Sequence, residues 1–209
     1  MQMMKWICAF LLVLPVMVLA SDYPYETNVT VTFPANQYVA FSYAYEPATT
    51  NGNAISNVFA LLPSGSSVNL WSSQIQSWVN YPKNRTGWGI LGSNTVTRGT
   101  AWFVRSPVTT HITFSGLVPT NETTPVYIEN GVNILAYPYP ADVALTNTAV
   151  FKSLTIGEKL YVWTTNGWLQ YSKLRTGWQP SVSNIVLNNC RGILGISART
   201  NRIVYESRP

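Results

Sequence analysis

Charged residues are scarce in this sequence. Asp, Glu, Lys and Arg make up 10% of the 209 residues, whereas about a quarter of a soluble globular chain is usually charged. Aromatic residues reach 13%. This combination is unlike that of an intrinsically disordered protein, which has many charges and few aromatic residues, and unlike the Glu-, Lys-, Ala- and Leu-rich composition of coiled coils. The net charge of +5 comes from 13 basic and 8 acidic residues, so it reflects a shortage of acids.

Long apolar runs are also lacking, apart from one at the N-terminus. A short basic start, residues 1–5, precedes an apolar run at 6–19 and the small residue Ala20. The run is shorter than the roughly 20 residues that span a bilayer. We therefore predict a secretory signal peptide at residues 1–20; a retained N-terminal anchor is the alternative. Its removal would lower the net charge to +4 and leave a secreted, periplasmic or cell-surface protein with no stable membrane span.

Cysteine and histidine are nearly absent. Cys8 lies within the predicted signal peptide, so Cys190 would be the only cysteine of the mature chain, and His111 is the single histidine. One cysteine cannot form an intrachain disulfide, and it cannot build a cysteine-type zinc site. A structural thiol is a better interpretation of Cys190 than a nucleophile paired with His111. We expect no metal and no cofactor.

The chain contains an internal duplication. Residues 78–88, WVNYPKNRTGW, recur at 168–178 as WLQYSKLRTGW, with seven of eleven positions identical. We call this segment the repeated cassette. Further matches extend the duplication in both directions: Tyr43 with Tyr137, Tyr45 with Tyr139, Val58-Phe59 with Val150-Phe151, Leu62 with Leu154, Gly65 with Gly157, Trp71 with Trp163, and Arg98-Gly99 with Arg191-Gly192. Such self-similarity indicates a repeated structural unit.

The predicted fold is all-β, built from two homologous units of about ninety residues. The predicted boundaries are an N-terminal arm at 21–27, a first unit at 28–119, a linker at 120–125 and a second unit at 126–209. The units would be barrel-like or sandwich-like, either packed tightly together or related by a pseudo-twofold axis around a shared core. Short stretches rich in β-branched and aromatic residues, separated by turn residues, are typical of such strands.

Two local predictions are specific enough to test. The segment 38–45 alternates aromatic and small residues, with Ala40 on the face opposite to Phe41, which favours a central strand that is buried on both sides. Each unit is expected to contain at most one short helix, at 55–62 and 145–154. Thr146 is the expected cap of the second helix.

The order of motifs resembles that of tandem-repeat secreted β-proteins of environmental bacteria, a group of uncharacterised repeat domains. The motifs are Ala136-Tyr137-Pro138, the Gly-x-x-Leu-x-x-Trp stretch at 157–163, the cassette at 168–178, and Arg191-Gly192. The first unit departs from the pattern, because Ser42-Tyr43-Ala44 replaces the Tyr-Pro pair. The resemblance covers nearly the whole mature chain. It implies export and an all-β fold, and it implies no activity.

Catalytic motifs are not apparent. No acidic residue occupies equivalent positions in both repeats, and no local motif places two carboxylates on either side of one bond, as a glycosidase requires. Nucleophile elbows, phosphate-binding loops, zinc spacings and calcium loops are missing from the sequence. We predict that the protein is not an enzyme. Nucleic acid is not an expected partner either, because the mature chain has no cluster of Lys and Arg.

The repeated cassette has two interpretations. Its candidate residues are Trp78, Tyr81, Arg85, Trp88, Trp168, Tyr171, Arg175 and Trp178. In the structural interpretation the aromatic residues fill the core, the arginines stack on them or bond turn carbonyls, and Gly87 and Gly177 supply a positive φ. In the functional interpretation some of the rings form an exposed platform for sugars, present twice.

The sequence therefore predicts a secreted, non-catalytic β-rich module with a role in surface structure or protein interaction. The alternative is a carbohydrate-binding module that uses the cassette. A cell-surface protein or a glycan would be the partner.

Overall fold

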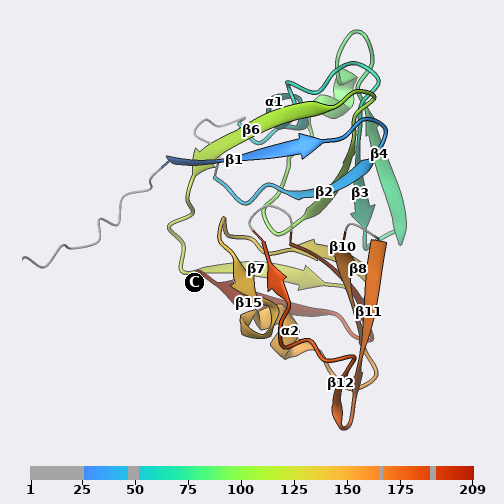
Figure 1. Cartoon of the computed structure of the whole chain (residues 1–209), viewed down its shortest axis with the longest axis vertical. Coiled ribbons are helices and arrows are strands. Elements are labelled where there is room, and N and C mark those ends of the chain that lie inside the picture. The colour runs from blue at the N-terminus through green and yellow to red at the C-terminus, as the bar shows by residue number, and fades with distance from the viewer. Residues whose placement is uncertain (1–25, 47–51, 165–166, 189–191) are drawn as a thin grey trace, which may run out of the picture.

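Strands account for 52% of the residues in the computed structural model and helices for 10%, which confirms the predicted all-β fold. The structure describes residues 26–46, 52–164, 167–188 and 192–209 (Figure 1). The predicted signal peptide and Cys190 lie outside these ranges. Within them, no helix is long and apolar enough to cross a membrane.

The first half of the chain forms a two-stranded ribbon, a four-stranded sheet and a core between them. The ribbon pairs β1 (Glu26–Phe33) with β6 (Thr110–Leu117). The sheet has the order β2-β5-β3-β4, with β2 at Tyr38–Ser42, β3 at Ser67–Ser72, β4 at Ser77–Pro82 and β5 at Ala101–Arg105. Inward-facing residues of both layers form an aromatic core that includes Phe33, Phe41, Phe59, Trp102 and Phe114. The helix α1 (Ile55–Val58) and the 3-10 turn η1 (Gly89–Ser93) lie in the connections.

The second half has the same arrangement with some additions. Its ribbon pairs β7 with β15, and its sheet has the order β12-β11-β10-β14-β8. The bounds are β7 Thr123–Ile128, β8 Gly131–Ala136, β9 Val143–Ala144, β10 Lys159–Thr164, β11 Gly167–Leu174, β12 Gly177–Gln179, β13 Val186–Leu187, β14 Ile193–Ala198 and β15 Arg202–Ser207. The short strands β9 and β13 pair with each other.

Strands that the sequence repeat relates have the same neighbours in both halves, since β2-β5-β3-β4 corresponds to β8-β14-β10-β11. The division into two homologous units stays a prediction. The expected boundaries differ from the strands in two places. Strand β1 begins at Glu26, within the predicted arm 21–27, because Glu26 and Thr27 already pair with β6. Strand β7 begins at Thr123, within the predicted linker 120–125, because Thr124 faces inward and Pro125 outward, which continues the alternation of a strand.

The outer faces of the two sheets pack against each other and form a third apolar cluster. Its buried members are Ala40, Ala101, Phe103, Ile134, Ala136 and Ile193. This junction explains one wrong prediction. Strand β2 lies at the edge of its sheet rather than at the centre, yet Ala40 is only 4% exposed, because its outer face contacts the second half.

Among the described residues each half contains one α-helix, in agreement with the expected limit of one, and both helices are shorter than expected. The predicted helix at 145–154 is divided into the 3-10 turn η2 (Leu145–Asn147) and the helix α2 (Ala149–Ser153). Thr148 caps α2, not Thr146 as predicted: the Thr148 hydroxyl accepts a hydrogen bond from the Phe151 amide at 3.2 Å. The extended backbone of Thr148 is what places its hydroxyl over the first helical turn.

Candidate functional site

The repeated cassette forms the same polar contacts in both halves, and its lysine makes them. The Lys83 ammonium donates to the carbonyl of Leu62 at 2.7 Å and lies 5.7 Å from the centre of the Trp88 ring. The Lys173 ammonium donates to the carbonyl of Leu154 at 2.6 Å and lies 5.8 Å from the Trp178 ring. The prediction assigned these contacts to Arg85 and Arg175. Both arginines are exposed.

Four of the cassette aromatics belong to the cores. Tyr81 and Tyr171 are each 8% exposed and Trp88 is 6% exposed, while Trp178 is half-buried and stacks on Phe151 with ring centres 5.1 Å apart. The predicted positive φ angles are confirmed at Gly87 (107°) and Gly177 (122°). The structural interpretation therefore accounts for most of the cassette.

Trp78 and Trp168 are different, because they lie on the outer faces of the sheets. They are 45% and 36% exposed. Trp78 meets Trp71 edge-on at 5.4 Å, and Trp168 meets Trp163 edge-on at 5.1 Å. Phe103 joins the two pairs, with its ring 5.3 Å from Trp78, 5.0 Å from Trp163 and 6.0 Å from Trp168. We call these five residues the junction cluster.

Two clefts lie at the junction of the two halves. The first has a volume of about 480 Å³ and is lined by Trp71, by the segment 96–100 and by residues of β7 and β8. The second has a volume of about 420 Å³ and is lined by Trp163, by residues 186–188 and by residues of β1 and β2. The repeat pairs Trp71 with Trp163, so each cleft holds one member of that pair. Sequence reasoning missed these clefts, because each one combines residues from both halves.

The first cleft contains an unusual charged pair. The Arg98 Nη1 atom lies 3.6 Å from Glu46 Oε1, and the two side chains are 19% and 35% exposed. This distance is beyond that of a good hydrogen bond, and among the described residues the buried Nη1 atom has no hydrogen-bond partner. Neither residue belongs to the cassette. Glu46 has no acidic counterpart in the repeat, where Pro140 takes its place.

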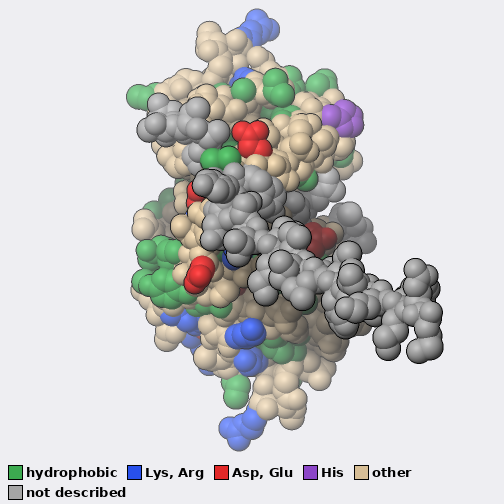
Figure 2. Space-filling model, turned by 90° about the vertical axis from the view of Figure 1, so that its left-hand side faces the viewer, with side chains coloured by type: hydrophobic (Ala, Val, Ile, Leu, Met, Phe, Trp, Pro, Cys, Tyr) green, Lys and Arg blue, Asp and Glu red, His purple; other side chains and the backbone are tan. Residues whose placement is uncertain are grey.

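The outer face of the ribbon β7–β15 is apolar. Tyr127, Ile203 and Tyr205 are 61%, 51% and 60% exposed, and Ile203 lies directly opposite Tyr127 across the ribbon. Figure 2 shows hydrophobic side chains gathered on the lower half of the molecule, which the second half of the chain forms. The ribbon β1–β6 carries polar side chains on its outer face: Thr30 contacts Thr113, and Thr32 contacts His111, both at 2.9 Å.

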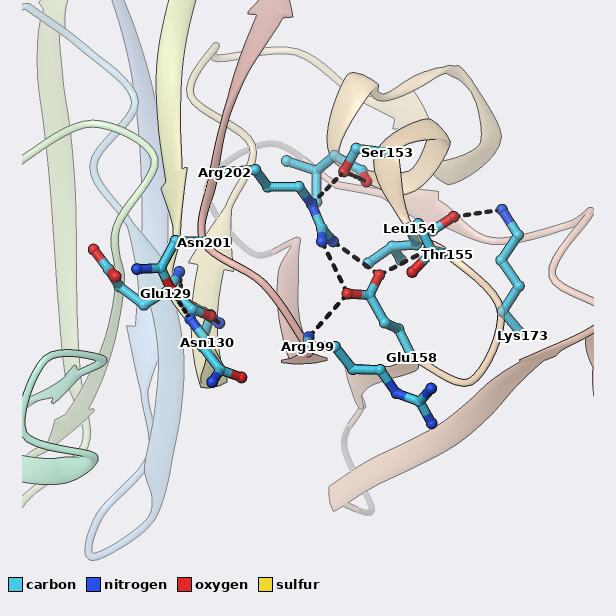
Figure 3. A network of polar contacts seen from close by, with 12 residues as sticks. Glu129, Asn130, Ser153, Leu154, Thr155, Glu158, Lys173, Arg199, Asn201 and Arg202 are labelled. Atoms are coloured by element: carbon cyan, nitrogen blue, oxygen red, sulfur yellow. Dashed lines mark hydrogen bonds and ion pairs between the residues drawn. The ribbon is translucent and has the colours of Figure 1, made fainter.

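A buried carboxylate, Glu158, organises the polar interior of the second half (Figure 3). It accepts hydrogen bonds from both terminal nitrogens of Arg202, at 2.8 and 2.9 Å, and from the amides of Arg199 and Thr155, at 3.0 and 2.7 Å. Burial by itself raises the pKa of Glu158, but these bonds and the charge of Arg202 outweigh burial and lower the pKa to about 2. The pair holds α2, β10 and β15 together.

A second buried carboxylate, Glu206, binds the first turn of the helix α2. It is 3% exposed and accepts hydrogen bonds from the amides of Ala149 and Val150, at 2.9 and 2.7 Å. Burial raises the pKa of Glu206, although these amides and the nearby charge of Lys152 act in the opposite direction. The same carboxylate contributes, after burial, to raising the pKa of Tyr137 to about 12. In the part of the chain that the structure describes, no three His, Cys, Asp or Glu residues are grouped to hold a metal.

Comparisons with known proteins add no assignment. No protein-family model, no curated protein and no solved structure matches this chain. The resemblance to tandem-repeat secreted β-proteins stays a prediction, and functional arguments depend on the geometry above.

Proposed function

We propose that the protein is an exported, non-catalytic module that binds a partner protein through the outer face of the ribbon β7–β15. The observation that carries this proposal is the exposure of Tyr127, Ile203 and Tyr205 on one face of two paired strands. Exposed apolar residues are common singly, but a contiguous group on a rigid surface is typical of an interaction site.

The other ribbon supports this interpretation. In β1–β6 the residue opposite Thr32 is His111 and the residue opposite Thr30 is Thr113, so the same kind of two-stranded ribbon is stable with a polar outer face. The apolar face of β7–β15 is therefore not required for folding. Tyrosine also suits a protein interface, because it offers a large ring and a hydroxyl with few rotatable bonds.

The buried carboxylates support a non-catalytic role. Among the described residues Glu158 and Glu206 are the buried acids, and each is saturated by contacts that hold the fold together. The Glu158 carboxylate accepts hydrogen bonds from Arg202 and two backbone amides, and the Glu206 carboxylate accepts them from two amides in the first turn of α2. A general acid or base must instead reach a substrate.

Site-specific photocrosslinking tests the proposal. The photoreactive residue p-benzoylphenylalanine replaces Tyr205 in the natively expressed protein, and in the matched control it replaces Thr113 on the other ribbon. We expect a discrete crosslinked product from position 205, identified by mass spectrometry, and none from position 113. Adding Ile203→Asp should abolish the product, because a charge would be buried at the centre of the contact. Equal crosslinking from both ribbons, or none from position 205, would contradict the proposal.

Glycan binding is the second candidate function. Trp78 and Trp168 support it, because both keep more than a third of their surface exposed and sugars stack on aromatic faces. A glycan screen monitored by tryptophan fluorescence tests this candidate, with Trp78→Ala and Trp168→Ala as variants. A folded variant that loses a binding signal would support it, and a screen without any signal would remove it.

A further inference from the structure

We propose that the first junction cleft, which contains Arg98, Glu46 and Trp71, binds a neutral saccharide. This inference rests on the glycan-binding candidate but places the ligand at different residues from the repeated cassette. It shares Tyr127 with the protein contact proposed for the ribbon β7–β15, and that contact is tested separately at Tyr205 and Ile203.

The cleft has the size and position of a ligand site. Its volume of about 480 Å³ is within the range of roughly 300–1,000 Å³ that small-molecule sites occupy. Its walls come from both halves: the segment 96–100 and Trp71 lie on one side, and residues 124–127 and 134–135 lie on the other. The junction fixes the two walls relative to each other, because the Ala136 amide donates to the Gly99 carbonyl at 2.9 Å.

The charged pair offers a donor and an acceptor side by side. The Arg98 Nη1 atom and Glu46 Oε1 are separated by 3.6 Å, which leaves the buried Nη1–H without a hydrogen-bond partner among the described residues. A hydroxyl group can accept from Arg98 and donate to Glu46 at the same time. Two neighbouring hydroxyls of a sugar ring match such a pair. A buried polar group without a partner favours ligands that form a hydrogen bond with it over ligands that do not.

The remaining lining supplies a rigid aromatic wall. The Trp71 indole nitrogen donates to the Val132 carbonyl at 2.8 Å, so the ring is fixed across the junction before any ligand arrives. Tyr127 contributes a second, exposed ring, and Thr97 and Thr100 contribute hydroxyls. Aromatic faces next to hydroxyl and charged groups are suited to the alternating apolar and polar faces of a sugar.

Charge balance selects a neutral ligand. Among the described lining residues, Glu46 is the one acid and Arg98 the one base, and their formal charges cancel. The Glu46 carboxylate would repel a uronic acid or a phosphate. The second cleft provides an internal comparison, because it contains Trp163 but its described lining includes no Arg, Lys, Asp or Glu.

NMR titration of the full mature chain tests the inference. The probes are glucose, galactose, mannose, N-acetylglucosamine and their common disaccharides. Glucuronic acid, which differs from glucose by one carboxylate, is the charged control. We expect at least one neutral saccharide to shift the amide signals of Thr97, Arg98 and Gly99. Arg98→Gln and Glu46→Gln should each weaken binding at least about ten-fold. Arg105→Gln changes a half-buried arginine that does not line the cleft and should leave affinity unchanged.

The outcomes separate this inference from the broader glycan-binding candidate. Shifts confined to Trp78 and Trp168, and unaffected by Arg98→Gln, would overturn the cleft site while glycan binding stands. Tighter binding of glucuronic acid than of glucose would overturn the neutral-ligand assignment. No shift with any probe at millimolar concentration would overturn both. Thermal unfolding identifies a variant that fails to fold, and the nearly isosteric Glu46→Gln then carries the test.

Discussion

The two halves of the molecule hold the same strand order with different interior chemistry. In the first half Phe114, on β6, packs against Phe41, Phe33 and Phe59 with ring centres 4.2, 6.2 and 6.1 Å apart. Glu206 occupies the corresponding place on β15. In the first ribbon Phe114 follows two residues after Ile112, which pairs with Val31. In the second ribbon Glu206 follows two residues after Val204, which pairs with Val126. One ribbon is therefore anchored by aromatic packing and the other by a carboxylate that binds a helix.

A second pair of positions shows the same contrast. The repeat aligns Glu158 with Ser66, and the register of the ribbons aligns Arg202 with Thr110. Glu158 and Arg202 form a buried ion pair at 2.8 Å, whereas Thr110 contacts the hydroxyl of Ser106 at 3.0 Å. The comparison indicates that strand pairing defines the architecture. The same strand pairing can enclose either a cluster of aromatic rings or a network of hydrogen-bonded charged groups. The two interiors should therefore tolerate different substitutions.

Exchanging one residue between the two interiors should have the largest effect. Phe114→Glu places a carboxylate among aromatic rings and provides no donors for it, so we expect a loss of more than about 4 kcal/mol in the free energy of unfolding. Urea unfolding followed by near-UV circular dichroism measures this loss. Phe114→Leu is the control, and it should cost less than about 1.5 kcal/mol. A mild effect of Phe114→Glu would mean that the first core is open to water.

Breaking the buried ion pair should have the next largest effect. Arg202→Met removes the partner and leaves Glu158 buried and uncompensated, which we expect to cost about 3–5 kcal/mol. The double variant Arg202→Met, Glu158→Gln should recover part of this loss, because the uncompensated charge is gone. Thr110→Val, at the corresponding place in the first half, should cost only about 1 kcal/mol. Equal losses from Arg202→Met and Thr110→Val would contradict the contrast between the halves.

The two buried acids should give opposite pH dependences. The pKa of Glu158 is about 2 in the folded protein and 4.5 in the reference state, so its contribution, roughly 3 kcal/mol, is present above pH 4.5 and is lost as the pH falls toward 2. The pKa of Glu206 is raised on folding, so its contribution is present below pH 4.5 and decreases as the pH rises. Urea unfolding between pH 2 and pH 7 measures both effects. Glu158→Gln should remove the acid-side loss, and Glu206→Gln should leave that loss in place. Wild-type stability that does not fall below pH 4.5 would contradict the assignment.

The pattern of strands was predictable because each strand leaves a local signal. The predicted strand at 38–45 begins at the first residue of β2 (Tyr38–Ser42) and extends three residues beyond its end. Period-two alternation and turn residues are short-range properties of the sequence. The positive φ at Gly87 was predictable for the same reason, since no other residue adopts that angle at so little cost.

The candidate site was less predictable, because it depends on contacts between distant parts of the chain. The cassette indicated that Trp78 and Tyr81 belong to one segment, but their burial differs because Trp78 faces the junction and Tyr81 faces the core. Nothing local to Arg98 or Glu46 indicates that they meet across a cleft. The lysine of the cassette was likewise overlooked, although Lys83 and Lys173 are identical in both repeats, because their carbonyl partners lie about twenty residues away along the chain.

The junction cluster should respond almost equally to the loss of either exposed tryptophan. Trp78→Ala and Trp168→Ala each remove one ring next to Phe103 while the core below stays intact, so we expect a cost of about 1–2 kcal/mol for each. Each substitution should also remove one edge-to-face tryptophan pair and reduce the exciton-coupled signal in far-UV circular dichroism. Tyr81→Ala, which opens a cavity in the core, is the contrasting variant at about 3 kcal/mol or more. Global unfolding by Trp78→Ala would show that the outer face is part of the core.

The smallest effect should come from the turn glycines, where the two halves are alike. An added Cβ would meet no atom within 4 Å at Gly87 or at Gly177, and both residues have a φ that L-amino acids rarely adopt. Gly87→Ala and Gly177→Ala should therefore cost the same, about 1 kcal/mol each, from backbone strain alone. Matched urea unfolding curves measure this difference. If the free energy of unfolding fell by several kcal/mol more in one variant than in the other, the two turns would contribute unequally to stability. The similarity of the halves would then be limited to the path of the backbone.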